Sequence, residues 1–226
     1  MKITYLGHAC LQIDTGGKSM LVDPFISGNP LADKIDVDSL HPDYILLTHA
    51  HGDHIADAES IARRTGAPLI CNAEMSYYYD AKGLKTIGMN TGGKTTIDEI
   101  TIKSTIAFHS SSFPDGTYGG NPNGYVIAAN GKRIYVAGDT ALSVEMKLIP
   151  EVNGPLDLAV FPVGDFFTMG YEDACIASNF VQCNRVLGCH FDTFPPIAID
   201  HQKAKDHFSA KGKVLLLLGI GESMDV

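Results

Sequence analysis

The stretch at residues 46–54, Leu-Leu-Thr-His-Ala-His-Gly-Asp-His, constrains the folding of this 226-residue chain more than any other segment. It begins inside an apolar run at 44–47 that is typical of a buried strand. Three histidines and one aspartate fall within its last six residues. Neutral imidazole and carboxylate groups are preferred ligands of zinc and similar metals. The stretch therefore predicts a metal-binding loop at the end of a strand.

The spacing within this loop indicates two binding points. His49 and His51 are two residues apart, so an extended backbone turns both side chains to one side. Gly52 permits a sharp turn, after which Asp53 and His54 can face a second point nearby. One such loop has the geometry to serve two adjacent metals.

Residues 48–54 resemble the signature T-H-x-H-x-D-H of the metallo-β-lactamase superfamily. Three later residues, His109, Asp139 and His190, follow in the order of that superfamily's isolated histidine, aspartate after a strand, and last histidine. Taken singly, each has a structural explanation as a loop, turn or core residue. Their joint position at the ends of expected strands favours metal ligands.

A closer likeness is to the small metal-dependent hydrolases of this superfamily that are related to ascorbate-6-phosphate lactonases. It rests on four short segments, at 6–9 (Leu-Gly-His-Ala), 161–164 (Phe-Pro-Val-Gly), 167–170 (Phe-Thr-Met-Gly) and 193–196 (Thr-Phe-Pro-Pro). The likeness implies that His8 lies beside the metals as an outer-shell group.

The resemblance also implies a dinuclear centre with a complete set of ligands. One metal would be held by His49, His51 and His109, and the other by Asp53, His54 and His190, with Asp139 bridging the two. A bound metal lowers the pKa of its water from about 15.7 toward 7, which provides a hydroxide nucleophile. The expected catalytic residues are Asp53, Asp139 and His8, with Asp139 orienting the hydroxide. Three such ligands per metal favour Zn²⁺, although Mn²⁺, Fe²⁺ and Ni²⁺ are feasible.

Composition limits the class of protein. With 45% hydrophobic and 19% charged residues, the chain is typical of a folded protein, and we expect one domain over 1–226. No apolar run is long enough to span a membrane, and the N-terminus has no apolar signal segment. The five cysteines lack paired metal spacing, as expected for reduced, mostly buried thiols in the cytoplasm. A net charge of −9 argues against nucleic-acid binding.

Strand and helix signals alternate through both halves of the chain. Strands are expected at 2–6, 10–14, 19–22, 44–48, 68–71, 85–88, 95–98, 100–108, 125–129, 133–137, 158–162, 185–189 and 214–218. Helices are expected at 57–64, 74–82, 141–149, 172–182 and 200–210, with site-bordering loops at 25–42 and 110–122. We predict an α/β fold, a four-layer αββα sandwich of two mixed sheets with helices outside.

The leading functional prediction is a hydrolase that cleaves a small-molecule ester, lactone, amide or phosphoester. Few basic residues lie near the motifs, which weighs against a phosphorylated substrate. The alternatives are an RNA-processing nuclease, a di-iron redox protein and a metal-binding scaffold. We expect a small-molecule substrate as partner, without nucleic acid or membrane, and a homo-oligomer is compatible with the sequence. The sequence leaves open whether Phe166, Phe167, Phe191 and Phe194 line the pocket or the core.

Overall fold

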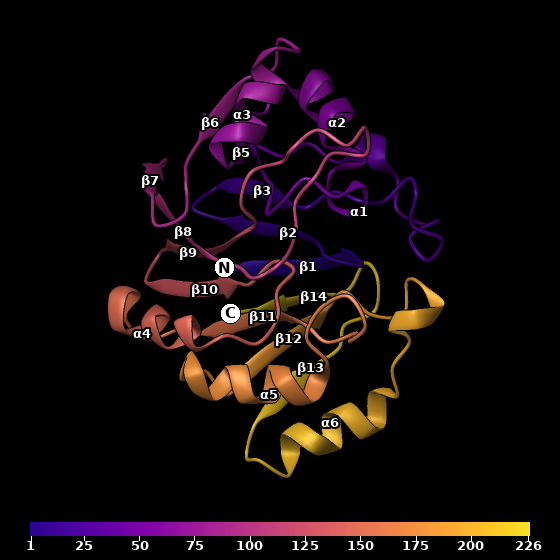
Figure 1. Cartoon of the computed structure of the whole chain (residues 1–226), viewed down its shortest axis with the longest axis vertical. Helices are drawn as coiled ribbons and strands as arrows, with labels where there is room; N and C mark the ends of the chain where they lie inside the picture. Colours follow the sequence, from indigo (N-terminus) through magenta and orange to yellow (C-terminus); the bar gives the residue numbers. More distant parts are fainter.

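The strands form two sheets that face each other in the computed structural model, which describes all residues from 1 to 226 (Figure 1). The first sheet contains, in spatial order, β14 (Ser223–Asp225), β1 (Lys2–Gly7), β2 (Cys10–Thr15), β3 (Lys18–Val22), β4 (Tyr44–Leu46), β5 (Leu69–Cys71) and β6 (Thr86–Gly88). The second contains β13 (Val214–Leu216), β12 (Arg185–Cys189), β11 (Leu158–Pro162), β10 (Lys132–Val136), β9 (Asn123–Ala129), β8 (Ile100–Ile106) and β7 (Lys94–Ile97). Each sheet mixes parallel and antiparallel pairs.

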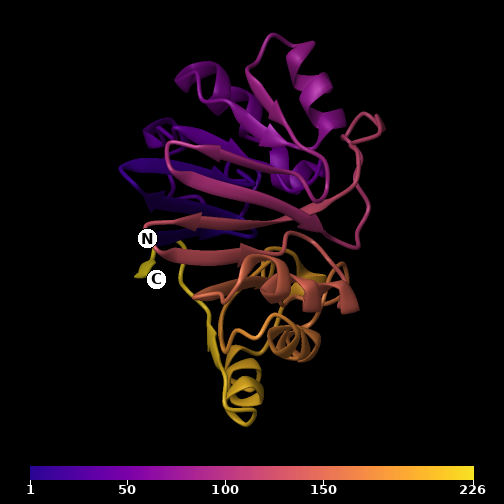
Figure 2. The same ribbon diagram turned by 90° about the vertical axis from the view of Figure 1, so that its left-hand side faces the viewer.

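Helices cover the outer faces of the sheets (Figures 1 and 2). On the side of the first sheet lie α1 (Gly52–Ile55), α2 (Ala58–Thr65) and α3 (Ala73–Asp80). On the side of the second lie α4 (Leu148–Asn153), α5 (Tyr171–Phe180) and α6 (His201–Ser209). Three short 3₁₀ turns complete the chain: η1 (Val37–Ser39), η2 (Val144–Lys147) and η3 (Pro195–Ile197). The predicted αββα sandwich is confirmed.

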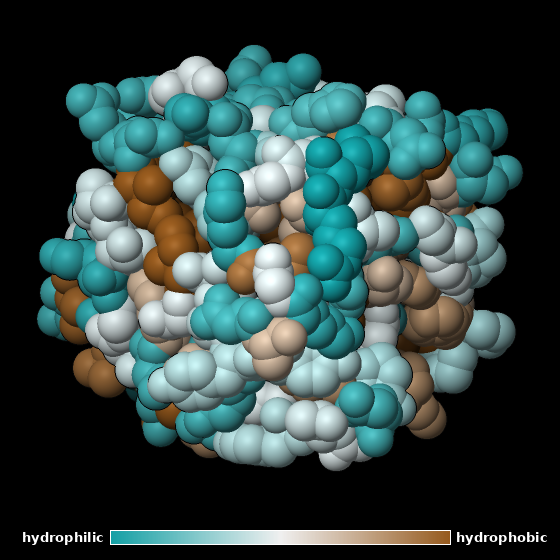
Figure 3. Space-filling view, turned by 90° about the horizontal axis from the view of Figure 1, so that it is seen from above, coloured by the Kyte–Doolittle hydropathy of each residue, from teal (hydrophilic) through white to brown (hydrophobic).

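Two apolar cores hold these layers together. Alternate residues of facing strands, such as Ile13 of β2 and Ile102 of β8, belong to one buried cluster between the sheets. A second cluster packs the first sheet on α2 and α3, where Ile61 and Met75 are fully buried. Seen from above, the exposed surface on the side of the first sheet is mostly hydrophilic (Figure 3). Burial of apolar area therefore sets the layer order.

The five cysteines are free and buried, as expected from the sequence. Burial raises the pKa of the Cys189 thiol well above its ordinary value, and the negative charges of Asp139 and Asp23 raise it further. Cys189 belongs to the apolar core. None of the helices combines the length and hydrophobicity needed to cross a bilayer.

Two of the hairpin turns contain glycine at positions that the local sequence favours. Gly16 and Gly17 have positive φ angles of 61° and 74°, and Asn130 and Gly131 have 52° and 73°. Two central residues with positive φ match the twist of the flanking strands. These dipeptides therefore connect β2 to β3 between the paired residues Thr15 and Lys18, and β9 to β10 between Ala129 and Lys132.

The predicted elements need correction in several places, among them the strands predicted at 100–108 and 214–218, which end at Ile106 and Leu216. The strand at 44–48 ends at Leu46, because the following residues turn toward the edge of the sheet. The helix predicted at 141–149 is instead η2 followed by α4, since the Ser143 side chain accepts the Glu145 N–H and starts the helical turns later. The chain also contains β14, which pairs antiparallel with β1 and returns the C-terminus to the first sheet. Such a short polar strand carries little periodic signal.

Two predicted loops are also more ordered than expected. Gly52 opens the helical turn α1, without the positive φ of a glycine-dependent sharp turn. The segment at 110–122 is not wholly exposed, because Ser111 and Phe113 are buried. The Phe113 ring stacks on Tyr78 of α3 with centroids 3.7 Å apart. This stacking fixes the loop against the first sheet's helices.

Candidate metal centre

The candidate ligands meet where several strands from both sheets end. His8 follows β1, and residues 49–54 follow β4 in the first sheet. His109, Asp139 and His190 follow β8, β10 and β12 in the second sheet. The structure therefore brings every predicted site residue to one edge of the sandwich.

One group of ligand atoms consists of His49, His51 and His109, which lie within 4.8 Å of one another. His49 Nε2 is 3.0 Å from His51 Nδ1. The other ring nitrogen of His51, Nε2, lies 3.3 Å from Ser110 Oγ, which orients the ring. His49 is fully buried, whereas the other two rings are partly exposed.

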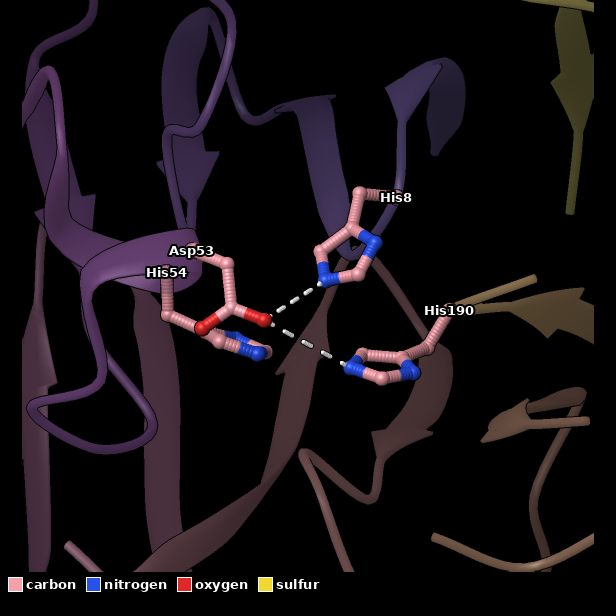
Figure 4. A group of neighbouring side chains, drawn as sticks. All are labelled: His8, Asp53, His54 and His190. Atoms are coloured by element: carbon pink, nitrogen blue, oxygen red, sulfur yellow. Dashed lines mark hydrogen bonds and ion pairs between the residues drawn. The ribbon is translucent and has the colours of Figure 1, made fainter. Parts of the chain in front are cut away.

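A second group consists of His8, Asp53, His54 and His190, also within 4.8 Å (Figure 4). Figure 4 shows the Asp53 carboxylate, from α1, directed at His8 and His190. Asp53 Oδ2 lies 3.1 Å from His8 Nε2 and 3.9 Å from His190 Nε2. Gly52 lies between the pair His49 and His51 and the pair Asp53 and His54, although ligand atoms of His49 and His54 also lie within 4.8 Å of each other, together with Asp23.

Asp139 lies between the two groups. Its Oδ2 atom is 3.1 Å from His190 Nε2 and 3.3 Å from His54 Nε2. The same oxygen is 3.6 Å from His109 Nε2. One carboxylate oxygen is therefore close to imidazoles of both groups, which is the position that a bridging ligand requires.

Asp23 is a buried residue of the site that the sequence reasoning missed. Its Oδ1 accepts the Thr48 N–H at 2.8 Å, and its Oδ2 accepts the Thr48 hydroxyl at 2.6 Å. Oδ2 also accepts His54 Nδ1–H at 2.8 Å. Because the Thr48 hydroxyl donates its proton toward Asp23, its oxygen can accept a hydrogen bond from His49 Nδ1–H at 3.0 Å. Asp23 therefore leaves the Nε2 lone pairs of His49 and His54 free for a metal.

The position of Asp23 had one signal in the sequence. It directly follows β3, whose parallel neighbour β4 delivers the histidine motif. Parallel neighbours end at the same edge, so a polar residue there is a candidate partner of the motif.

His8 is held at both ring nitrogens. Nε2 lies 3.1 Å from Asp53 Oδ2, and Nδ1 lies 3.0 Å from Thr193 Oγ1. Burial is the largest effect on this ring and lowers the pKa of His8 to about 4, although the hydrogen bond to Asp53 opposes the change. A neutral His8 can therefore donate from Nε2 to Asp53 and accept the Thr193 hydroxyl at Nδ1. Thr193 is a second partner that the sequence reasoning missed.

Charge and burial prepare the centre for a cation. Burial lowers the pKa of His49 well below its ordinary value and also lowers those of His51 and His109, so these rings are neutral. Burial opposes the charge of Asp139, but His190 and His54 outweigh it and hold its pKa well below the usual range. Neutral imidazoles beside an ionised carboxylate are the forms that bind metals.

The donor set fits a divalent metal. Burial disfavours a charged His54, yet Asp139 and Asp23 outweigh this and raise its pKa well above the ordinary value. Its buried Nε2 atom nevertheless has no hydrogen-bond partner in the protein. A cation between His54 and Asp139 would engage both. Six imidazoles and three carboxylates converge here, and nitrogen and oxygen donors of this kind suit zinc, manganese and iron.

A cavity of about 420 Å³ opens above these residues. It is lined by His51, Asp53, His109, Ser110, Asp139, Phe167, His190, Phe194 and Pro196. The four phenylalanines therefore divide: Phe167 and Phe194 form pocket walls, Phe191 is buried against Tyr5, and Phe166 is 71% exposed. No lysine or arginine lines the cavity. We call it the metal pocket.

Comparison with known proteins identifies the family of this chain. The family model described as the beta-lactamase superfamily domain matches residues 2–190. A metal-dependent hydrolase of Flavobacterium johnsoniae is 55% identical over 226 residues, covering 100% of both chains. One from Christiangramia forsetii is 53% identical over 227 residues, again with 100% of both covered.

A solved structure extends the likeness to three dimensions. A metallo hydrolase from the hyperthermophilic archaeon Ignicoccus hospitalis superposes with a TM-score of 0.89 at 34% identity. The match covers 100% of this chain and 98% of that one. The chain belongs to the metallo-β-lactamase superfamily, in the group whose members are named metal-dependent hydrolases.

Proposed function

We propose that this protein is a hydrolase that uses two divalent metals to cleave a small-molecule ester, lactone or amide. One observation carries the proposal: two groups of ligand atoms share Asp139, whose Oδ2 lies within 3.6 Å of imidazoles from both. Two cations held there would supply Lewis acidity and an activated water. Zinc is the first choice, with manganese, iron and nickel as alternatives.

The residues of the chain would divide the work. His49, His51 and His109 would hold one metal, and Asp53, His54 and His190 the other, with Asp139 between them. His8 donates to Asp53 while Thr193 holds its second nitrogen, and the His8 side chain is fully buried. Because both ring nitrogens are occupied, His8 is better suited to positioning Asp53 than to passing a proton to a leaving group.

The lining of the metal pocket favours the binding of uncharged substrates. Phe167, Phe194 and Pro196 provide apolar contacts, and the lining contains no lysine or arginine to bind a phosphate. Phosphoesters are therefore the least favoured of the substrate classes. Hydrolysis of an ester adds the oxygen of water to the acyl carbon, releases the alcohol and leaves a proton in solution.

A screen of the metal-loaded protein tests this proposal. Esters, lactones, amides, phosphodiesters and β-lactams should be assayed with zinc and with manganese, beside His49→Ala as a metal-binding control. Turnover of an uncharged acyl substrate by the wild type, lost in His49→Ala, is expected. Turnover confined to phosphodiesters, or equal turnover in both proteins, would refute the proposal.

Two other functions have specific tests. An RNA-processing nuclease needs a basic surface, whereas the chain has 17 basic and 26 acidic residues. A gel-shift assay with RNA at two salt concentrations should show no binding. A di-iron redox protein would give an iron-dependent visible spectrum, which a zinc hydrolase would lack.

We further propose that this protein is located in the cytoplasm.

A further inference from the structure

Three cavities form a row that begins at the metal pocket. The second, of about 340 Å³, shares His109 with the metal pocket. It also contains Ile106 and Thr91, and these two residues line a third cavity of about 340 Å³. The third lies between β8 and the η2–α4 segment, and we call it the apolar groove.

The apolar groove is built almost wholly from hydrocarbon. Its hydrophobic lining residues are Ile106, Met146, Leu148, Ile149 and Val152. Met146 and Ile149 are buried and form the floor, whereas Leu148 and Val152 are 58% and 64% exposed. Two charged side chains also line it, but Lys103 donates to the Gly92 carbonyl and Glu145 accepts from Ser143. Both charged groups therefore already have a hydrogen-bond partner in the protein.

Exposed apolar side chains in this arrangement indicate a ligand. Leu148 and Val152 are four residues apart on α4, so they fall on one side of the helix, and both are more than half exposed. Contact of these side chains with water is unfavourable, and an apolar ligand in the groove would remove it. Because the row of cavities starts at the metal pocket, the occupant most consistent with the structure is part of the substrate.

We propose that the substrate carries an aliphatic chain, which leaves the metal pocket beside His109 and lies in the apolar groove. The proposal rests on the hydrolase function above and narrows its substrate to long-chain acyl or alkyl esters, lactones or amides. Thr140 and Ala141 fix the backbone of Phe108 by hydrogen bonds at 3.0 Å, next to Asp139. The path between metal pocket and groove thus has a fixed wall.

Chain-length dependence tests the proposal. The zinc-loaded wild type, Leu148→Glu and Val214→Glu would be assayed on p-nitrophenyl butyrate and p-nitrophenyl decanoate. Val214→Glu is the control. Val214 is 53% exposed and lies on β13, the edge strand of the second sheet that is farthest from β7 and β8. Each buried methylene should raise kcat/KM about fourfold, so three or four of them give a decanoate preference of roughly a hundredfold. Leu148→Glu should reduce this ratio below about tenfold, and Val214→Glu should keep it.

A binding measurement separates the groove from the hydrolytic function. Butyrate and decanoate are titrated calorimetrically into the same three proteins, which requires no turnover. Decanoate should bind the wild type more tightly by a similar factor, and Leu148→Glu should remove that gain. If no ester is cleaved but this pattern holds, the hydrolase function fails and the groove stands. An equal gain in affinity from butyrate to decanoate in the wild type and in Leu148→Glu would overturn the proposed role of the groove. Gel filtration gives a second test. If the wild type is a homo-oligomer and Leu148→Glu is not, the groove is an interface between copies and the proposal fails.

Discussion

Replacement of Asp23 with asparagine should weaken both proposed metal sites at once. The Asp23 side chain is 1% exposed and accepts three hydrogen bonds. If the amide oxygen keeps the bond from the Thr48 N–H, the amide NH₂ replaces Oδ2. It then faces the Thr48 hydroxyl and His54 Nδ1, which must accept instead of donate. The Thr48 proton turns to His49 Nδ1.

Both histidines would then carry their proton on Nε2, the atom that should bind metal. Loss of an outer partner of this kind lowers metal affinity about 10- to 100-fold, which corresponds to roughly 1.4–2.7 kcal/mol. The backbone should tolerate the change, because Asp23 has a φ of 44° and asparagine adopts positive φ readily. The expected result is a loss of affinity at two sites, with the fold retained.

The assay is competition with a chromophoric chelator, with thermal unfolding measured in parallel. Asp57→Asn is the matched control, because Asp57 is a buried carboxylate that accepts the N–H groups of Ile26 and Ser27 and touches no histidine ligand. Asp57→Asn should lower the melting temperature and leave metal affinity unchanged. If Asp23→Asn behaves in the same way, the proposed control of His49 and His54 by Asp23 is wrong.

Three further predictions concern single residues. His8→Ala should keep both metals but lower kcat by about 10- to 1,000-fold, because Asp53 loses a hydrogen-bond donor. An unchanged kcat would contradict the positioning role. Loss of metal in elemental analysis would contradict it as well. His8→Gln, which can still donate to Asp53, should recover part of the rate. Asp139→Ala should loosen the second metal and abolish hydrolysis while circular dichroism shows the fold retained; full turnover would exclude the bridge. Gly7→Ala should destabilise the protein measurably on denaturant titration, because Gly7 has a φ of 104° and an added Cβ would lie 2.8 Å from Asn29 Nδ2; unchanged unfolding would show that the turn before His8 can relax.

The candidate ligands could be predicted from the sequence because their signals are local. Residues 49–54 combine ligand chemistry with close spacing, and His109, Asp139 and His190 each follow a strand with clear periodicity. Strand ends converge in a sandwich of this kind, so their proximity followed from the predicted fold. The structure brings these residues together, and the assignment of each to a metal stays a prediction.

The supporting residues could not be found in the same way. Asp23 and Thr193 lie far from the histidine motif in sequence, and only the pairing of β3 with β4 and the fold of the loop after β12 bring them to the site. The phenylalanines show the same limit. Phe191 and Phe194 are three residues apart, yet one packs on Tyr5 and the other lines the metal pocket. Tertiary packing, which local sequence does not encode, decides between these positions.

The most direct test of the account is the number and position of metals in the zinc-reconstituted protein. Anomalous diffraction at the zinc edge should show two sites per chain. One should lie among the imidazoles of His49, His51 and His109, and the other among Asp53, His54 and His190, with Asp139 between them. A single site, matched by one zinc per chain in elemental analysis after reconstitution, would contradict the dinuclear centre.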